Sequence, residues 1–440
     1  MKKNCISLLT ALFLAAILFA LPVSAVQTYT EGDWISRLRA LHDSTYGEDL
    51  YRWLGAQAEL AKDNQGAFVT ITEGKNGITK SNDGNNTMLV HSVQTLTVTN
   101  LNNLSEEEKR ERIRAAADPV EDMIANVLNA FRMDHPEINW LNNVTRIGWS
   151  ASIQNGTATV NVFLILKVDA SSASDRYDIR TTTSPALSGL IQRANDVLDA
   201  SGARDAVSDE EAIRALNTWL TKNNAYSTAS SFTDAHRDPI VALTGKSGTN
   251  GPICESYAKA FKILCDLMDI PCVLIAGDAT NASGASGAHM WNYVRMDNGK
   301  WYGVDVTWND PTVAGRESSA TSGFETDRYL LSGQRSMPSH SSVNYLNTTH
   351  IVAFGNAPAL SELDYKDEPK ASYTISGTVT PAGGSTTITL LNSRGETVYS
   401  GVIHAGSYSL TVTADPGEYT LKVERPKYVT RTYTITLGGN

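Results

Sequence analysis

The sequence predicts an α+β protein in which a central helix packs on an antiparallel sheet, with an α+β region before it and a β-sandwich after it. Three observations predict this arrangement. Capping boxes at Ser105 and Ser208 each open an amphipathic helix. An Asn298-Gly299 turn joins two apolar strands that follow the second helix. Beyond Tyr373 the chain changes to short β-rich runs between Gly, Pro and Asp turns, as in a small sandwich.

The first residues of the chain have the build of a secretory signal peptide. Lys2 and Lys3 precede an apolar run from Ala11 to Leu21, and small residues lead to a cleavage site after Ala25. The run has 11 residues, whereas a helix that spans a membrane needs about 20. We therefore expect a secreted, extracellular protein without a membrane anchor.

The 440 residues exceed what one hydrophobic core usually serves. After the signal peptide of residues 1–25, we expect four further parts. These are an α+β N-terminal region (26–206), a middle domain (207–363), a charged linker (364–371) and a β-sandwich module (372–440).

The N-terminal region carries structural signals but no recognisable chemistry. The capping box at Ser105 opens a helix that Pro119 is expected to interrupt. Asn155-Gly156 predicts a hairpin whose second strand is Thr157–Val168. The histidines of this region are interpreted as surface or capping residues: His42, His91 and His135.

Charge and cysteine content exclude several kinds of partner. The net charge is −10 and becomes more negative when the leader lysines are removed, which argues against nucleic acid. No CxxC pair or cysteine-histidine cluster is present, so neither a metal nor a cofactor is expected. Three cysteines remain after cleavage, which leaves at least one free thiol. A bridge between Cys265 and Cys272 is an open alternative to two packed thiols.

Cys254 is the candidate nucleophile. Gly251-Pro252 disfavours helix just upstream, so Cys254 should lie in the first turn of a helix whose inner face continues to Phe261 and Cys265. The positive end of the helix dipole favours a thiolate there. The alternative is a small buried cysteine that only fills the core.

His289 and Asp305 lie on the two strands of a predicted hairpin that follows the strand Cys272–Gly277 and a Gly- and Ser-rich loop. A two-residue turn would place Asp305 on the face opposite to His289. A three-residue loop with Gly299 left-handed places Asp305 opposite Trp291 and diagonal to His289. We predict the three-residue loop, because only that register lets imidazole and carboxylate meet.

Three short segments resemble the transglutaminase-like superfamily in order and spacing: Cys254-Glu255-Ser256-Tyr257-Ala258, His289-Met290-Trp291-Asn292 and Asp305-Val306-Thr307-Trp308. The resemblance covers Ser208 to Asp310, and Ser256 stands where the family commonly has glycine. It implies a papain-like or transglutaminase-like core with a nucleophile helix on an antiparallel sheet. It also implies that aromatic side chains line the substrate site: Tyr226, Trp291 and Trp308. For Tyr226, a place in the hydrophobic core is an open alternative. The C-terminal module resembles the prealbumin-like and carboxypeptidase-regulatory-like sandwiches of secreted bacterial enzymes.

The resemblance implies that Cys254, His289 and Asp305 act as nucleophile, base and orienting acid, and that a thioester forms on Cys254 from a protein or peptide amide. Attack by water makes a protease or amidase, which we favour because water is always available. Attack by a lysine amine makes a transglutaminase. A third alternative is a noncatalytic scaffold, with the C-terminal module binding a cell-wall glycan or an extracellular protein.

Overall fold

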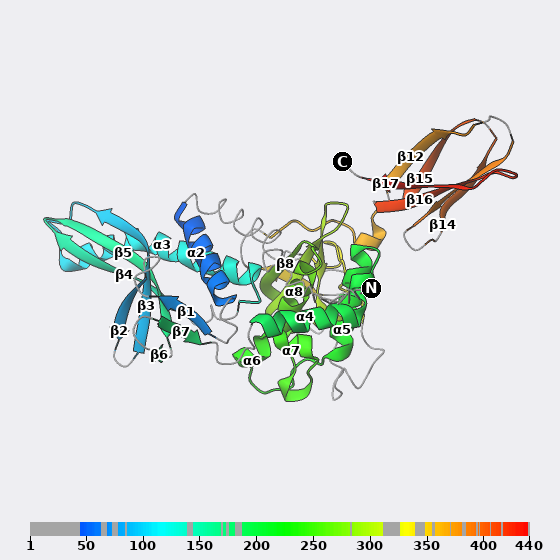
Figure 1. Ribbon diagram of the computed structural model, residues 1–440. Coiled ribbons are helices and arrows are strands. Elements are labelled where there is room, and N and C mark those ends of the chain that lie inside the picture. Colours follow the sequence, from blue (N-terminus) through cyan, green and yellow to red (C-terminus); the bar gives the residue numbers. More distant parts are fainter. Residues whose placement is uncertain are drawn as a thin grey trace, which may run out of the picture.

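The computed structural model separates into three parts along the chain (Figure 1). An N-terminal sheet region, a mixed middle region and a C-terminal all-β module follow one another in space as they do in sequence. The predicted signal peptide, residues 1–25, lies outside the described residues. None of the described helices has the length and apolar character that crossing a membrane requires. The described residues are 45–62, 68–72, 78–83, 86–138, 144–168, 170–172, 176–180, 187–281, 284–310, 326–338, 348–353, 357–369, 371–380, 384–392, 395, 397–404, 406–414 and 417–438.

The N-terminal region has two helices beside a four-stranded antiparallel sheet of order β2-β3-β5-β4. The helices are α2 (Thr45–Lys62) and α3 (Glu106–Asp134). The sheet strands are β2 (Ile78–Asp83), β3 (Asn86–Val98), β4 (Val144–Gln154) and β5 (Thr157–Val168). A smaller sheet has the strands β1 (Phe68–Thr72), β6 (Ala170–Ser172) and β7 (Arg176–Arg180).

Two local predictions for this region are confirmed and one is wrong. Ser105 and Glu108 form a reciprocal capping box, and Asn155-Gly156 joins β4 to β5 with both residues left-handed. The expected break at Pro119 does not occur, because α3 continues to Asp134. Pro119 lies on the exposed face, where water can satisfy the carbonyl that loses its hydrogen bond, while Val120 and the rest of the apolar face remain packed.

The middle region combines helices with a four-stranded antiparallel sheet of order β10-β9-β8-β11. The strands are β8 (Cys272–Thr280), β9 (Ser286–Arg295), β10 (Trp301–Val304) and β11 (Thr349–Val352). The helices are α4 (Leu187–Ser201), α5 (Asp209–Asn223), α6 (Asp234–Arg237), α7 (Pro239–Thr244), α8 (Cys254–Asp266) and α9 (Val306–Asn309), with 3-10 turns at Ala203–Asp205, Gly248–Asn250 and Tyr365–Asp367.

The register predicted for the β9–β10 hairpin is confirmed. Val304 pairs with Asn292 and Tyr302 with Val294, which is the pairing of a three-residue loop, and Gly299 is left-handed with φ +75°. The second strand is shorter than the expected Lys300–Trp308, because Asp305 caps α9 immediately after Val304. The expected loop before His289 is mostly hairpin, since β8 and β9 remain paired as far as Thr280 and Ser286.

The C-terminal module is a β-sandwich, as predicted. The pair β12 (Ala371–Thr378) and β15 (Ser407–Ala414) faces a four-stranded sheet of order β14-β13-β16-β17 across a core that includes Ile375, Ile388 and Val412. The strands of that sheet are β13 (Thr386–Leu391), β14 (Thr397–Ile403), β16 (Gly417–Glu424) and β17 (Arg431–Leu437). In the charged segment that precedes the module, Glu368 accepts a hydrogen bond of 2.7 Å from Lys300 Nζ.

One hydrophobic core joins the N-terminal region to the middle sheet. Phe131 of α3 belongs to the same buried cluster as Leu274 of β8 and Trp291 of β9. By contrast, Leu198 of α4 packs with the helices of the middle region, including Phe261 of α8. The apolar faces of α3 and β8 therefore stabilise the same interior.

A buried polar cluster lies at this junction. Lys262 of α8 is fully buried and donates to both Asp266 oxygens, each at 2.9 Å, and to the Cys272 carbonyl at 3.1 Å. Burial opposes the charge of Lys262, but the attraction of Asp266, with a smaller contribution from Asp134, outweighs it and raises the pKa of Lys262. Asp134 in turn accepts a hydrogen bond of 2.7 Å from Tyr51.

The three N-terminal histidines have different surroundings. His135 caps the C-terminus of α3, as expected, but it is only 3% exposed and is therefore not a surface residue. Its Nδ1 atom lies 3.2 Å from Oε1 of Glu137. His91 is half-buried and stacks on Trp53 with ring centres 3.9 Å apart. His42 lies outside the described residues.

Removing one partner of the buried Lys262–Asp266 pair should destabilise the protein strongly. Lys262→Met leaves a carboxylate without its cation, which typically costs about 3–5 kcal/mol. Urea unfolding followed by tryptophan fluorescence measures the free energy of unfolding. In the double variant Lys262→Met with Asp266→Leu, most of the loss should be recovered. Arg335→Ala, which removes an exposed pair with Glu362, is the control and should cost under about 1 kcal/mol. A Lys262→Met variant as stable as wild type would contradict this account.

Candidate active site

Cys254 is the first residue of α8, as expected from the Gly251-Pro252 segment before it. Its side chain is half-buried, whereas Cys265 and Cys272 are buried, and all three thiols are free. The alternative of a Cys265–Cys272 bridge is therefore wrong. The Ser256 hydroxyl donates to the Asp238 carbonyl at 2.6 Å and accepts from the Ala242 amide at 3.2 Å. Serine in place of the family's glycine thus ties the start of α8 to α7.

His289 and Asp305 meet, as the hairpin register requires. His289 Nε2 lies 2.7 Å from Asp305 Oδ2. The carboxylate is fully buried, and its other oxygen, Oδ1, accepts the Trp308 amide of α9 at 3.0 Å. Asp305 therefore caps a helix with one oxygen and holds an imidazole with the other.

A glycine lets the neighbouring strands approach this pair closely. Gly277 of β8 pairs with His289 of β9 on one side and with Val352 of β11 on the other. A Cβ at this position would lie 1.9 Å from the Ile351 carbonyl oxygen and 2.9 Å from the Trp291 ring. Any side chain at residue 277 would push apart the strands that carry the site.

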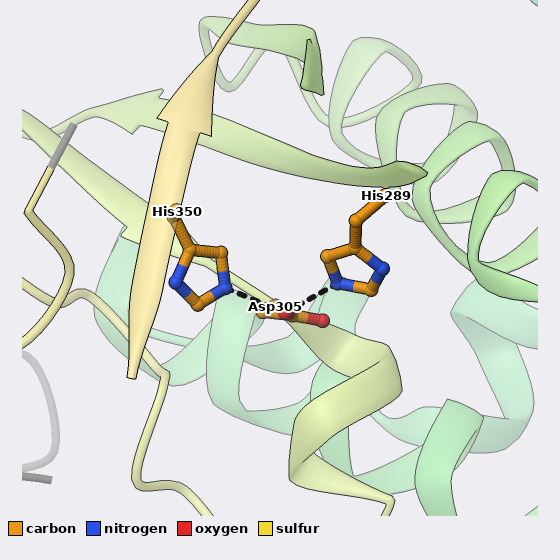
Figure 2. Close-up of side chains that lie close together, drawn as sticks. All are labelled: His289, Asp305 and His350. Carbon is orange, nitrogen blue, oxygen red and sulfur yellow. Dashed lines mark hydrogen bonds and ion pairs between the residues drawn. The ribbon is translucent and has the colours of Figure 1, made fainter. Parts of the chain in front are cut away.

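A third side chain, which the sequence did not indicate, completes the group. His350 Nε2 lies 2.9 Å from the same Asp305 oxygen that His289 contacts, as Figure 2 shows. His350 comes from β11, which lies at the opposite edge of the sheet from β10. The run Thr348-Thr349-His350-Ile351-Val352 has the composition of a strand. Nothing in that run indicates that it pairs with β8.

The two histidines on Asp305 differ in charge. Burial opposes ionisation of all three groups, but the attraction between Asp305 and His289 outweighs it. The pKa of His289 is raised to about 10, and the pKa of Asp305 falls well below its usual range. For His350, burial dominates and lowers the pKa. Near neutral pH, His289 and Asp305 therefore form an ion pair, and His350 is a neutral hydrogen-bond donor.

Cys254 contacts both His289 and Tyr226. The Cys254 thiol hydrogen-bonds to His289, and both the interaction and the charge of the sulfur contribute to the raised pKa of that histidine. The half-buried Tyr226 hydroxyl also hydrogen-bonds to Cys254. Burial and the nearby sulfur raise the pKa of Tyr226, so its hydroxyl keeps its proton. Tyr226 thus lies beside the candidate nucleophile.

The two tryptophans expected to line a substrate site enclose His289. The ring centre of Trp291 is 5.9 Å from that of His289 and the ring centre of Trp308 is 5.3 Å away, and both are stacked. Trp291 is 1% exposed and belongs to the core, which leaves its indole no surface for a substrate. Trp308 is half-buried. Together the two indoles restrict the orientation of the His289 ring.

The ligand atoms of His289, Asp305 and His350 lie within 4.8 Å of one another, so this group could hold a metal ion. The two nitrogen–oxygen distances, 2.7 and 2.9 Å, are those of charge-assisted hydrogen bonds, which account for the cluster without an ion. The expectation of no metal and no cofactor stays a prediction.

A cavity of about 320 Å³ lies next to the start of α8. Its walls come from the end of α3, including Arg132 and Met133, from Glu255 and Lys259 of α8, and from Met290 of β9. Glu255 and Met290 directly follow Cys254 and His289 in the sequence. The N-terminal region therefore contributes to a cavity bordered by both site elements.

Comparisons with known proteins support the family resemblance. Residues 198–306 match the model of the transglutaminase-like superfamily, a segment that contains Cys254, His289 and Asp305 but ends before His350. A search of the curated proteins found no match.

Two solved structures are only distantly similar to this chain. One, described as the crystal structure of a TGase, is 13% identical over 51% of this chain, with a TM-score of 0.24. The chain covers 53% of that structure. The other, a BSP domain of a biofilm-associated protein, is 12% identical over 88% of this chain and 54% of its own length, with a TM-score of 0.14. The family match and the site geometry lead to the same conclusion, that the chain carries a transglutaminase-like core over residues 198–306.

Proposed function

We propose that this protein is a secreted cysteine enzyme that cleaves protein or peptide amides through a thioester on Cys254. The observation that carries the proposal is the 2.7 Å bond from His289 to a fully buried Asp305, with the Cys254 thiol on the same imidazole. The transglutaminase-like superfamily is generally catalytic and includes cysteine-dependent acyltransferases and proteases, which supports this choice.

The proposed reaction needs one nucleophile and one shuttled proton. The Cys254 thiolate attacks the amide carbon, and the amide of Cys254 can stabilise the oxyanion. As the carbon–nitrogen bond breaks, His289 gives its proton to the leaving amine and a thioester remains. Water then attacks the thioester while His289 takes its proton, which releases the acid and restores the thiolate–imidazolium pair. Asp305 holds the ring and stabilises its charge throughout.

Hydrolysis and transamidation share the first of these steps. We favour hydrolysis because water is always available, whereas a transglutaminase needs a site that admits a lysine amine and excludes water. The C-terminal sandwich is proposed to bind a cell-wall or extracellular protein partner. A purely noncatalytic scaffold would not need the Cys254 thiol at the start of α8 to contact the charged imidazole of His289.

Replacing Cys254 should abolish turnover and leave folding intact. We expect wild type to release fragments from labelled casein, and Cys254→Ala to lose at least about a thousandfold in rate. Cys265→Ala, at a buried thiol on the same helix, is the matched control and should keep its activity.

The same assay separates the alternative functions when a labelled primary amine is added. Amine incorporated into casein without fragments would identify a transglutaminase. If wild type forms neither product although its Cys254 thiol can be alkylated, the noncatalytic scaffold is favoured.

Activity should be lost at high pH, because His289 loses its proton there. Because the pKa of His289 is raised to about 10, its proton remains available for the leaving amine until the pH rises through that value. Asp305→Asn keeps the helix cap but removes the charge, so the alkaline limb of kcat/KM should move to lower pH. Asp327→Asn, at an exposed acid paired with Arg214, is the control and should not move it. An alkaline limb that stays in place in Asp305→Asn would contradict the ion pair.

Export is also a proposal, which rests on residues 1–25. We expect a bacterial host to release the protein into the medium or periplasm with Val26 as its first residue, as N-terminal sequencing would show. Leu14→Arg breaks the apolar run and should leave the uncleaved chain in the cytoplasm. A similar substitution at an exposed apolar residue outside the leader, Val429→Arg, controls for general effects on expression. Export of the Leu14→Arg chain at the wild-type level would exclude this signal.

A further inference from the structure

We propose that His350 is a positioning residue for the reaction: as a neutral donor, it holds the Asp305 carboxylate in the orientation that His289 needs. The inference rests on the proposed function and extends it, because His350 lies beyond the segment that matches the family model.

The hydrogen bonds of Asp305 define the role. Its Oδ1 accepts the Trp308 amide at 3.0 Å, which fixes one end of the carboxylate to α9. Its Oδ2 accepts His289 at 2.7 Å and His350 at 2.9 Å. Without His350, the shared oxygen would be held only by the ring that has to move its proton during the reaction. With His350, the carboxylate is held from two elements that do not take part in proton transfer.

The surroundings of His350 favour its neutral form. A carboxylate only accepts, so Nε2 of His350 carries the proton. Its other nitrogen, Nδ1, is buried and has no hydrogen-bond partner among the described residues. Protonation would therefore create an unsatisfied buried donor and a second cation beside His289. A neutral donor leaves the charge of Asp305 available to the imidazolium of His289.

Three aromatic rings surround His350 and restrict the orientation of its ring. Its ring centre lies 4.4 Å from Trp308 and 5.1 Å from Trp291, both edge to face, and 5.7 Å from Tyr329. His350 pairs with Ala279 of β8, so it reaches from one edge of the sheet to the residue that follows β10 at the other. Figure 2 shows the two rings approaching Asp305 from opposite sides. The same indoles thus restrict both histidines.

The test compares a variant without the donor and a variant that keeps a donor. His350→Phe keeps the ring and removes the donor, whereas His350→Gln keeps a donor near the position of Nε2. We expect kcat of the Phe variant to fall about 10- to 100-fold with KM unchanged. Because the bond from His350 helps to keep the pKa of Asp305 low, the acidic limb of kcat/KM should move to higher pH. His350→Gln should restore both kcat and the limb, and His404→Gln, in the sandwich, should resemble wild type.

A second measurement does not depend on turnover. In histidine-labelled protein at pH 7, nitrogen NMR should show His350 neutral with its proton on Nε2, and His289 charged. The His289 signals should shift in His350→Phe and return in His350→Gln. A wild type without any turnover would defeat the proposed function but leave this measurement valid. A charged His350, a stoichiometric metal bound by the three residues, or a folded Phe variant with wild-type kcat and pH limbs would overturn the inference.

Discussion

The buried negative charge of Asp305 is the constraint on which the rest of the site depends. A carboxylate without exposed surface is costly unless donors or a cation compensate for the lost water. Here the compensation comes from three elements that are far apart in the sequence: the first turn of α9, His289 of β9 and His350 of β11. The middle sheet therefore has to bring β9, β10 and β11 together before this residue can be buried with its charge.

The sheet order and register satisfy that requirement only in one arrangement. The three-residue loop with Gly299 left-handed sets the register between β9 and β10. A shift of one residue would turn the Asp305 carboxylate to the face away from His289. Gly277 lets β11 approach β8 closely enough for His350 to reach across. The helix that begins at Cys254 packs on this sheet, and Lys262 of the same helix links it to the core shared with α3. The N-terminal region is thus part of the interior that supports the site.

What the residue patterns alone could predict was local, whereas the meeting of Cys254 with His289 and Asp305 was implied by the family resemblance. The capping box at Ser105 and the register of the β9–β10 hairpin depend on residues a few positions apart, and the structure has both. The failures are nonlocal. Helix α3 continues through Pro119 because its packing outweighs the loss of one hydrogen bond. This packing involves residues far away in the sequence, so the local sequence does not indicate it. His350 lies 45 positions after Asp305 and reaches it because β11 pairs with β8. The residues around His350 indicate a strand, but they do not indicate which strand it pairs with.

The ion pair also links the chemistry to stability. The pKa of His289 is raised from 6.5 to about 10, so its contribution to stability is complete below about 6.5 and is lost as the pH rises through 10. The pKa of Asp305 is lowered from 3.8, so its contribution is present above that value and is lost only in strong acid. Both contributions coexist from mildly acidic to neutral pH, where the imidazolium and the carboxylate are also in the states that the proposed reaction needs. The interaction that orders this sheet is therefore the one that prepares the site, and the neutral His350 adds a hydrogen bond without adding a competing charge.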